Sequence, residues 1–234
     1  AALKAFQIID IEKTKQNKVE STSSRDVKIF ADKKSEKVII KFLESNTSFS
    51  ILSEEIGFID KKSKYVWIID PVDGSVNFSR GIPLSSVSIG LWKNNEPILG
   101  VIYDINNKDL YKGIVGLGAW KNQNKINVSN IENNSSAIIC TGFPIATDFS
   151  ENSIHDFVSK VKDFKKVRLL GSASLSLAYL ASSCVDAYFE KDIKIWDVAA
   201  GIPIVLAAGG YVDFYESKKN QLVVKASSSK GIIL

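Results

Sequence analysis

Two aspartates three residues apart, Asp70 and Asp73, are the residues of this sequence whose spacing points most directly to chemistry. They follow the apolar run 65–69, whose β-branched and aromatic residues predict a strand buried on both faces. Pro71 predicts that the strand ends at Asp70, and the dipeptide Asp73-Gly74 predicts a turn. Such a turn could present both carboxylates to a hard divalent cation, and the cation could hold a phosphate.

The same segment also has a purely structural interpretation. Turns favour Asp, Pro and Gly, so residues 70–74 could be no more than a turn after a core strand. In both interpretations Asp73 or Ser75 is expected to cap a following helix, whose first N–H groups would face the carboxylates. The segment alone does not decide between a capped turn and a phosphate-binding metal site.

Three other acidic positions could complete a set of ligands. Glu54 and Glu55 follow a predicted strand over 49–52. Asp197 begins a predicted apolar helix, and Asp32 lies in a predicted amphipathic one. Each position also has a purely structural interpretation. Glu54 and Glu55 could be a solvated loop pair, Asp197 a helix N-cap, and Asp32 an exposed helical acid. Their combination, rather than any one of them, favours a shared function.

Composition and charge exclude several classes of protein. The chain has 234 residues, of which 45% are hydrophobic and 24% charged, as in ordinary globular proteins. The net charge is +4, but no basic stripe with interleaved aromatic residues is present, so nucleic acid is not an expected partner. No apolar run approaches the roughly 20 residues of a membrane helix, so a membrane is not an expected partner either.

The cysteines and the histidine point away from thiol, zinc and triad chemistry. Cys140 and Cys184 lie among apolar neighbours and are expected to be buried free thiols, which suits a cytoplasmic protein. His155 is the only histidine, and its polar surroundings predict a surface position. The sequence therefore offers neither a zinc cluster nor a nucleophilic triad.

The pattern of predicted elements changes near the polar stretch 129–136. Before it, helical stripes over 1–18 and 27–45 precede strand-like runs at 49–52, 65–70, 86–92, 98–105 and 109–115. After it, strands at 137–141, 167–170, 185–190 and 211–215 alternate with helices at 150–164, 174–183 and 197–208. We therefore predict an N-terminal α+β domain over 1–133 and a C-terminal α/β domain over 134–234.

Three motifs, in order, resemble those of the inositol monophosphatase family of magnesium-dependent, lithium-sensitive sugar phosphatases. The pair Glu54-Glu55 is similar to the family's paired glutamates. Asp70-Pro-Val-Asp-Gly-Ser-Val-Asn-Phe78 is similar to its Asp-Pro-Ile/Leu-Asp-Gly-Thr/Ser-x-Asn-Phe signature. Trp196-Asp-Val-Ala-Ala-Gly201 is similar to its Trp-Asp-x-Ala-Ala/Gly-Gly signature. The resemblance covers nearly the whole chain and implies a layered αβαβα sandwich, a homodimer and a site between the halves.

The resemblance also implies a ligand set. Glu54, Asp70 and the Val72 carbonyl would hold a first Mg²⁺, and Asp70, Asp73 and Asp197 would hold a second. A third, looser ion would lean on Glu54, and Mn²⁺ would be able to substitute. Oxygen ligands of this kind suit Mg²⁺, which keeps several waters and prefers substrate phosphate as a partner.

Roles beyond the metal ligands follow from the same resemblance. Asp32 and Ser75 would orient the attacking water. Glu54 would be a catalytic residue as well as a metal ligand. Direct in-line attack by that water is expected, without a phosphoenzyme. Arg168 could reach a second phosphate or could be a surface charge. The remaining substrate contacts would come from Asp73, Gly74, Ser75, Gly171, Ser172, Ala173, Glu190 and Asp197.

Three functions remain open at this point. The first is hydrolysis of a small phosphorylated cyclitol or sugar, inositol monophosphate or fructose 1,6-bisphosphate. The second keeps the chemistry and changes the substrate to a 3′(2′),5′-bisphosphate nucleotide. The third is a regulatory or binding member of the family, for which a decayed set of carboxylates would be the sign. Every expected ligand is present, so the sequence favours catalysis.

Overall fold

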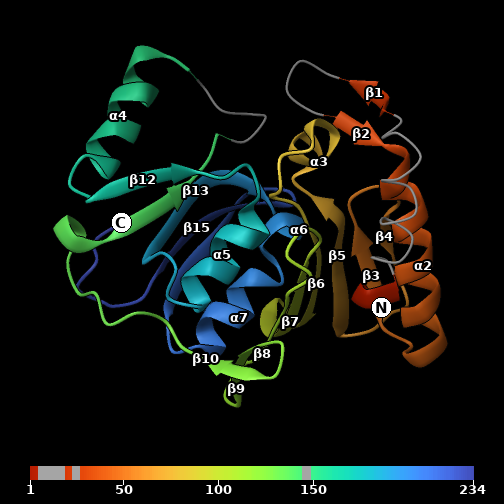
Figure 1. Ribbon diagram of the computed structural model, residues 1–234. Helices are drawn as coiled ribbons and strands as arrows, with labels where there is room; N and C mark the ends of the chain where they lie inside the picture. The colour runs from red at the N-terminus through yellow and green to blue at the C-terminus, as the bar shows by residue number, and fades with distance from the viewer. Residues whose placement is uncertain (5–18, 23–26, 144–148) are drawn as a thin grey trace.

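The computed structural model describes residues 1–4, 19–22, 27–143 and 149–234 of the chain. Two large β-sheets and the helices around them make up the fold (Figure 1). The helical stripe predicted over 1–18 falls almost wholly outside the described residues. In the described part of the chain, no helix is both long and apolar enough to cross a membrane.

The larger sheet has eight strands in the order β10-β9-β8-β7-β6-β5-β3-β4. Its strands are β3 (Ser50–Ser53), β4 (Gly57–Ile59), β5 (Tyr65–Asp73), β6 (Ser86–Lys93), β7 (Glu96–Asp104), β8 (Leu110–Ile114), β9 (Gly118–Lys121) and β10 (Asn124–Ile126). Strands β3 and β5 are parallel, and β5 to β10 form an antiparallel meander. The strands predicted at 49–52, 65–70, 86–92, 98–105 and 109–115 are confirmed, whereas the short strands β4, β9 and β10 were not predicted.

The smaller sheet has five strands in the order β12-β11-β13-β15-β14. Its strands are β11 (Ile138–Thr141), β12 (Lys166–Leu169), β13 (Ala187–Lys194), β14 (Tyr211–Lys218) and β15 (Gln221–Ser227). Strand β11 is parallel to β12 and β13, whereas β15 is antiparallel to β13 and β14. A further pair, β1 (Val19–Thr22) and β2 (Val27–Ile29), shows that residues 27–29 are strand rather than the start of the predicted helix.

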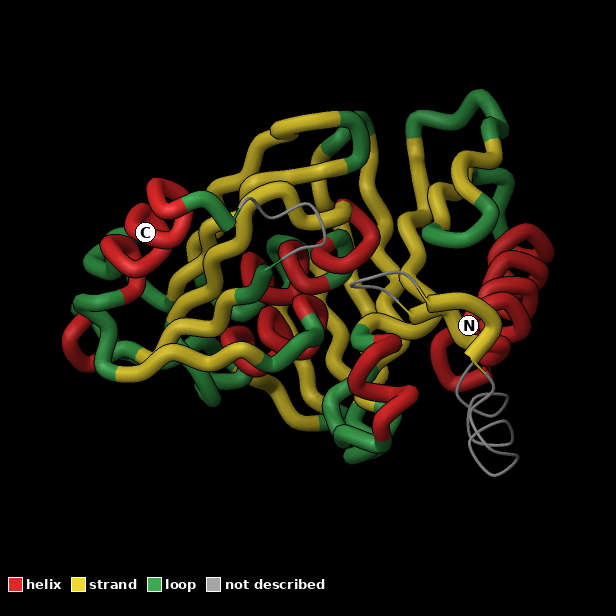
Figure 2. Tube along the Cα trace, turned by 90° about the horizontal axis from the view of Figure 1, so that it is seen from above, coloured by secondary structure: helices red, strands yellow, loops and turns green. Residues whose placement is uncertain are grey.

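The helices form three layers around the two sheets. Helix α2 (Phe30–Asn46) covers the outer face of the larger sheet, and α4 (Glu151–Val161) covers the outer face of the smaller one (Figure 1). Between the sheets lie α5 (Ala173–Ala181), α6 (Ile195–Val198) and α7 (Gly201–Ala207), as the perpendicular view also shows (Figure 2). Two short helices complete the fold: α3 (Ser75–Arg80) follows β5, and η1 (Asn134–Ser136) precedes β11. The predicted αβαβα sandwich is confirmed.

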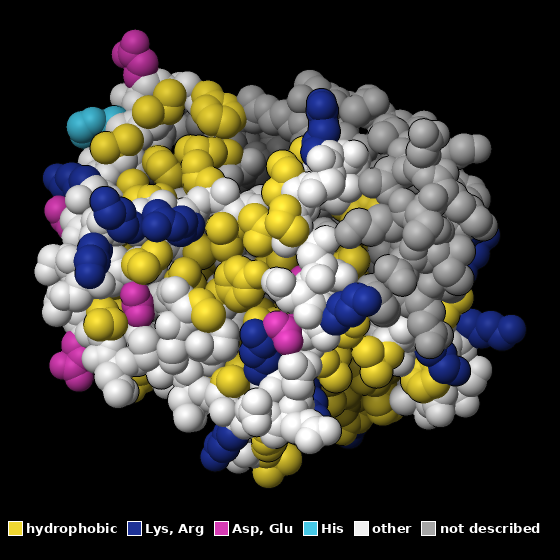
Figure 3. All heavy atoms as spheres, viewed as in Figure 1, with side chains coloured by type: hydrophobic (Ala, Val, Ile, Leu, Met, Phe, Trp, Pro, Cys, Tyr) yellow, Lys and Arg dark blue, Asp and Glu magenta, His cyan; other side chains and the backbone are white. Residues whose placement is uncertain are grey.

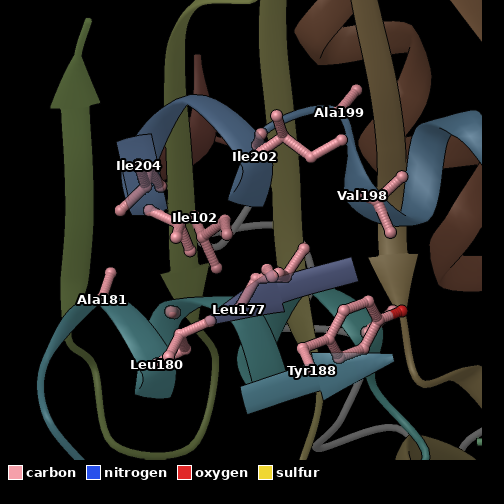
Figure 4. Packing of buried hydrophobic residues seen from close by; sticks show 14 of the residues in the cluster. Ile102, Leu177, Leu180, Ala181, Tyr188, Val198, Ala199, Ile202 and Ile204 are labelled. Atoms are coloured by element: carbon pink, nitrogen blue, oxygen red, sulfur yellow. The ribbon is translucent and has the colours of Figure 1, made fainter. Parts of the chain in front are cut away.

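The largest hydrophobic core lies in the central helical layer. Leu177 and Leu180 of α5 pack with Ile202 and Ile204 of α7, and Ile102 of β7 closes the cluster from the larger sheet (Figure 4). Burial of each such side chain contributes about 1.5–3 kcal/mol. The cluster takes residues from both sheets, so the two halves of the chain share one core. The division at residue 133 stays a prediction.

Three glycines on neighbouring strands allow a helical segment to lie directly on the larger sheet. Gly90, Gly100 and Gly113 are register partners on β6, β7 and β8. A Cβ atom added at Gly100 would overlap the backbone of Ala200, and one at Gly113 would come within 2.7 Å of the Ile204 Cα. The row therefore forms a groove for the α6–α7 segment.

Several sequence predictions need correction. The apolar helix predicted over 197–208 is two helices, and Asp197 lies inside α6 rather than at its N-cap, which is Lys194. Cys140 is buried as predicted, whereas Cys184 is exposed, because it follows the end of α5 at a surface turn. His155 is exposed, as predicted.

One face of the molecule carries exposed hydrophobic side chains over α4. Figure 3 shows hydrophobic side chains gathered at the upper left, the side on which α4 lies in Figure 1. Ile154 and Val158 of α4 are 46% and 51% exposed, and Phe149, just before the helix, is 45% exposed. On this face the Lys and Arg side chains are interspersed with hydrophobic and uncharged ones and do not join into one continuous basic surface.

Candidate functional site

A β-bulge turns both aspartates of the 70–73 segment to the same side. Strand β5 does not end at Asp70, as predicted, but continues through Pro71 to Asp73. Asp70 pairs with Ser88 and Asp73 with Ser86, so three steps along β5 match two along β6. In a regular strand residues three apart face opposite ways, and the extra residue removes that difference. The bulge also accommodates proline, which has no N–H for the ladder.

Glu54 reaches the same place from the neighbouring parallel strand. Ser53, the last residue of β3, pairs with Ile69, and the Glu54 N–H donates to the Ile69 carbonyl at 3.3 Å. Because β3 and β5 run parallel, their carboxyl ends lie at one edge of the sheet. The pairing of β3 with β5 therefore places Glu54 beside Asp70.

Asp197 comes from the central helical layer. The Trp92 indole donates to the Ala199 carbonyl at 2.9 Å, and the Ser88 hydroxyl donates to the Trp196 carbonyl at 3.4 Å. These two bonds tie the main chain on both sides of Asp197 to strand β6. The glycine groove holds the following residues, so the position of Asp197 depends on contacts between distant parts of the chain.

Serines at the start of α5 hold the carboxylate of Asp73. The Ser172 hydroxyl donates to its Oδ2 at 2.5 Å, and the Ser174 N–H donates to the same atom at 2.9 Å. The Ser174 hydroxyl also bonds this oxygen and lies 2.5 Å from the Ser86 hydroxyl. Ser172 in addition accepts from the Leu175 N–H as the N-cap of α5. The start of α5 is thereby fixed to β5.

Asn77 makes a second link between the halves. Its amide donates to the Leu84 carbonyl at 2.9 Å and to the Leu170 carbonyl at 2.8 Å. Gly171 follows with φ +68°, a conformation that glycine adopts at little cost, and its carbonyl also lies within reach of the Asn77 amide. The loop before α5 is thus held against α3.

The predicted side-chain cap of α3 is wrong. Neither Asp73 nor Ser75 caps the helix; the N-cap is Gly74, at φ 81° and without a side-chain hydrogen bond. The Asp73 carboxylate is bonded to the start of α5 instead. The Ser75 hydroxyl donates to the Val72 carbonyl at 2.9 Å, so it lies over the bulge rather than over its own helix.

The acidic side chains surround one cavity of about 570 Å³ between the two sheets. Among the described residues that line it, six are acidic and Lys194 is the basic one. The acidic ones are Glu54, Asp70, Asp73, Glu190, Asp192 and Asp197. Val72, Gly74, Ser75, Gly171, Ser172 and Ala173 also line it, so the structure brings together most of the predicted site.

Two predicted residues do not line the cavity. Asp32 is buried on α2 and is close enough for its charge to raise the pKa of Asp70. It is not the exposed helical acid of the structural alternative. Arg168 is exposed on β12, where its guanidinium donates to the Val167 carbonyl at 3.0 Å. Of the two expectations for Arg168, this position agrees with a surface charge.

Burial first, and the crowding of carboxylates second, set the electrostatics of the site. Burial raises the pKa of Asp70 well above its usual range, and the charges of Glu54, Asp73 and Asp197 raise it further. Burial also raises the pKa of Asp73, against the opposing hydrogen bonds from the α5 serines. The pKa of Asp197 is likewise raised by burial, and Lys194 only partly opposes this. Acidic groups thus outnumber basic ones among the described lining residues, and a bound cation would favour their ionised form.

The donor set fits a hard divalent cation. Carboxylate and main-chain carbonyl oxygens are what Mg²⁺ and Mn²⁺ prefer, and a cation would relieve the repulsion between the acids. Within the described residues, no three His, Cys, Asp or Glu side chains are already arranged as a formed metal site.

Glu190 gives a prediction that needs no metal. Burial raises its pKa to about 8, against the opposing effect of the Tyr188 hydroxyl and together with the charge of Asp73. A carboxyl whose pKa is higher in the folded than in the unfolded protein stabilises the fold below its unfolded value of 4.5. That stability is lost as the pH rises from there to about 8.

Glu190→Gln should therefore be less stable relative to wild type near pH 5 than near pH 9. The difference in free energy of unfolding between the two proteins should change by several kcal/mol, at about 1.4 kcal/mol per pKa unit. Urea unfolding in the presence of a chelator measures it. Glu96→Gln, at an exposed acid, is the control and should show a flat difference. Parallel curves for Glu190→Gln and wild type would contradict the assignment.

Several residues of the site were not anticipated from the sequence. Ser86 and Ser174 had no spacing that marked them, because their contact joins β6 to α5 across the core. Asn77 belongs to the motif over residues 70–78, but the sequence predicted no role for it. Glu36 is buried on α2 behind the cavity and accepts from the N–H groups of Glu55 and Ile56. It had one usable signal: it lies four residues after Asp32, hence on the same helical face.

Comparison with known proteins agrees with this geometry. The model of the inositol monophosphatase family matches residues 1–231. The Nus factor SuhB of Xylella fastidiosa is 40% identical over 183 residues, covering 77% of this chain and 66% of that protein. The fructose-1,6-bisphosphatase/inositol-1-monophosphatase of Thermococcus kodakarensis is 32% identical over 232 residues, covering 98% of this chain and 86% of that protein.

A solved structure supports the same relationship. The inositol monophosphatase from Anabaena superposes with a TM-score of 0.84 at 33% identity, covering 97% of this chain and 87% of that one. The sequence match, the common fold and the expected motifs around one cavity lead to a single conclusion. This chain belongs to the inositol monophosphatase family.

Proposed function

We propose that the protein is a Mg²⁺-dependent phosphomonoesterase that hydrolyses inositol monophosphate and fructose 1,6-bisphosphate. The observation that carries this proposal is the excess of acidic side chains around one cavity, with Lys194 as the basic residue among the described lining. A phosphate dianion would be repelled by such a cavity unless cations were bound in it. With cations bound, the same carboxylates become a phosphate site.

The ligands are proposed as the motifs imply. Glu54, Asp70 and the Val72 carbonyl would hold one ion, and Asp70, Asp73 and Asp197 another, with Asp70 between them. When bound, the ions would neutralise the phosphate, activate water and stabilise the leaving oxygen. The Val72 carbonyl accepts from Ser75 at 2.9 Å and keeps a second lone pair for a ligand bond.

The chain's own residues would orient the reactants. The Ser75 hydroxyl has its proton directed to the Val72 carbonyl, so its free lone pairs can accept from the attacking water. Asp32 does not line the cavity but lies near Asp70, and it is proposed to accept a second hydrogen bond from the same water. Gly74 and Ser75 line the cavity at the start of α3, and their N–H groups would contact the phosphate oxygens.

Substrate hydroxyls would be recognised by cavity-lining residues from the C-terminal half of the chain. Glu190 is 7% exposed and lines the cavity together with Gly171 and Ala173. A carboxyl there can accept a hydrogen bond from a ring hydroxyl, which favours a cyclitol or sugar over an alkyl phosphate. A homodimer in solution, also predicted, is checked by light scattering.

A binding role is the second candidate because a relative at 40% identity is named Nus factor SuhB. The two functions differ in what they need from the acidic residues. Catalysis requires Asp70, Asp73 and Asp197 to remain acidic, whereas a purely binding role does not. All of them are present around the cavity, which supports catalysis.

A panel of substrates tests the proposal. Phosphate release is measured from inositol 1-phosphate, fructose 1,6-bisphosphate, adenosine 3′,5′-bisphosphate and glycerol phosphate, with Mg²⁺ and with a chelator. We expect Mg²⁺-dependent release, faster from the first two. A preference for the nucleotide would contradict the substrate assignment, and no release from any ester would favour the binding role.

A further inference from the structure

The N-terminal half of helix α2 buries polar side chains against the larger sheet. Asp32, Ser35 and Glu36 are 3%, 0% and 1% exposed. Buried acids are uncommon, and a helix that covers a sheet normally presents apolar residues to it. The spacing of four places Asp32 and Glu36 on one face of the helix. This face lies over the two turns that carry the proposed metal ligands.

One oxygen of Glu36 fixes the turn that carries Glu54. Its Oε1 accepts from the N–H groups of Glu55 at 3.2 Å and Ile56 at 3.1 Å, and from the Ser53 hydroxyl. The donors are the residue before Glu54 and the two residues after it. A buried carboxyl oxygen that accepts from three donors is a strong anchor, because three hydrogen bonds to one atom hold the main chain of the turn more firmly than one could.

The same helical face also contacts the bulge in β5. The Ser35 hydroxyl donates to the Pro71 carbonyl at 3.4 Å, and Pro71 separates Asp70 from Val72. Asp32 lies near enough to Asp70 to raise its pKa. Both ligand-bearing turns are therefore held from one helix, on neighbouring parallel strands.

We propose that Glu36 is a positioning residue for the divalent metal centre. It holds the main chain of the 53–56 turn so that the Glu54 carboxylate stays beside Asp70, although the two negative charges repel each other. Without this anchor the turn would relax and Glu54 would move away. The inference rests on the proposed function, because it requires Glu54 and Asp70 to share metal binding.

Metal affinity tests the inference separately from activity. Dissociation constants for Mn²⁺ and Mg²⁺ are measured by titration calorimetry on metal-free protein, with circular dichroism to confirm folding. Glu36→Ala should weaken Mn²⁺ binding by about 10- to 100-fold, as expected when a residue that orients a ligand is lost. Glu36→Gln keeps an acceptor oxygen and should fall between Glu36→Ala and wild type.

Glu44→Ala is the matched control. Glu44 lies on the same helix but is exposed and paired with Lys61 at 3.0 Å, so its loss should leave Mn²⁺ affinity unchanged. In activity assays, Glu36→Ala should raise the Mg²⁺ concentration for half-maximal rate and leave kcat at saturating Mg²⁺ close to wild type. A purely structural role would lower stability without this shift.

The outcomes separate this inference from the proposed function. Wild-type Mn²⁺ affinity in folded Glu36→Ala would overturn the positioning role and leave the proposed function intact. If Glu36→Ala does not fold, the Mn²⁺ affinities of Ser53→Ala and Glu36→Gln test the inference instead. Each of these variants weakens the anchor while keeping most of its hydrogen bonds. Unchanged affinity in both would overturn the inference. Absence of divalent binding by the wild type would overturn the proposed function, and the inference with it.

Discussion

Asp70→Asn is expected to abolish phosphate release, with a loss of more than about 10³-fold in kcat. Asp70 is the residue proposed to contact both ions, and asparagine keeps the shape of aspartate while removing its charge. Its amide offers one weaker oxygen donor where two ionised ones are needed. Phosphate release from inositol 1-phosphate at saturating Mg²⁺ measures the effect.

Loss of activity in this variant should not come from loss of the fold. Asp70 is 2% exposed among other acids, and burial raises its pKa well above the usual range. Replacing it by a neutral side chain should leave metal-free stability unchanged or increase it. Asp163→Asn, at an exposed acid, is the matched control for both measurements. Wild-type-like turnover in Asp70→Asn would refute its place between the ions.

Gly100→Ala is expected to destabilise the protein by more than about 3 kcal/mol. The added Cβ would lie less than 3.0 Å from the Ala200 backbone, and a backbone atom cannot rotate away as a side chain can. The α6–α7 segment would have to lift from the sheet. Because Asp197 belongs to this segment, the fraction that still folds should also bind metal weakly.

The control for Gly100→Ala is a glycine whose Cβ would be unobstructed. Gly57 has φ +83° and no atom within 4 Å of an added Cβ, so Gly57→Ala carries only the strain of a left-handed conformation, about 1–2 kcal/mol. Urea unfolding compares the two variants. Equal losses would show that the glycine row is not needed for the close approach of the helix.

The fold and most of the site could be predicted because their signals are local. The apolar run 65–69 gave a buried strand, and the alternation after residue 136 gave strands and helices in the right order. The motifs around Glu54, Asp70 and Asp197 identified residues that do surround one cavity. Local sequence patterns thus identified both the elements and the acids they carry.

What could not be predicted depends on pairing between distant segments. The bulge in β5 arises from its register with Ser86 and Ser88, so Pro71 alone suggested a strand end that does not occur. Burial of Asp32 follows from how α2 packs on the sheet. Strand β15 lies between β13 and β14 in the sheet, and its own sequence did not predict a strand there.

The central claim is that the acidic cavity binds divalent cations through Asp70. Electron paramagnetic resonance of Mn²⁺ tests it most directly, because the signal of the free ion falls as the protein takes it up. Metal-free wild-type protein should bind more than one Mn²⁺ per chain, with competition by Mg²⁺, and Asp70→Asn should lose most of this binding. Equal uptake by Asp70→Asn and wild type, or no uptake by either, would contradict the account.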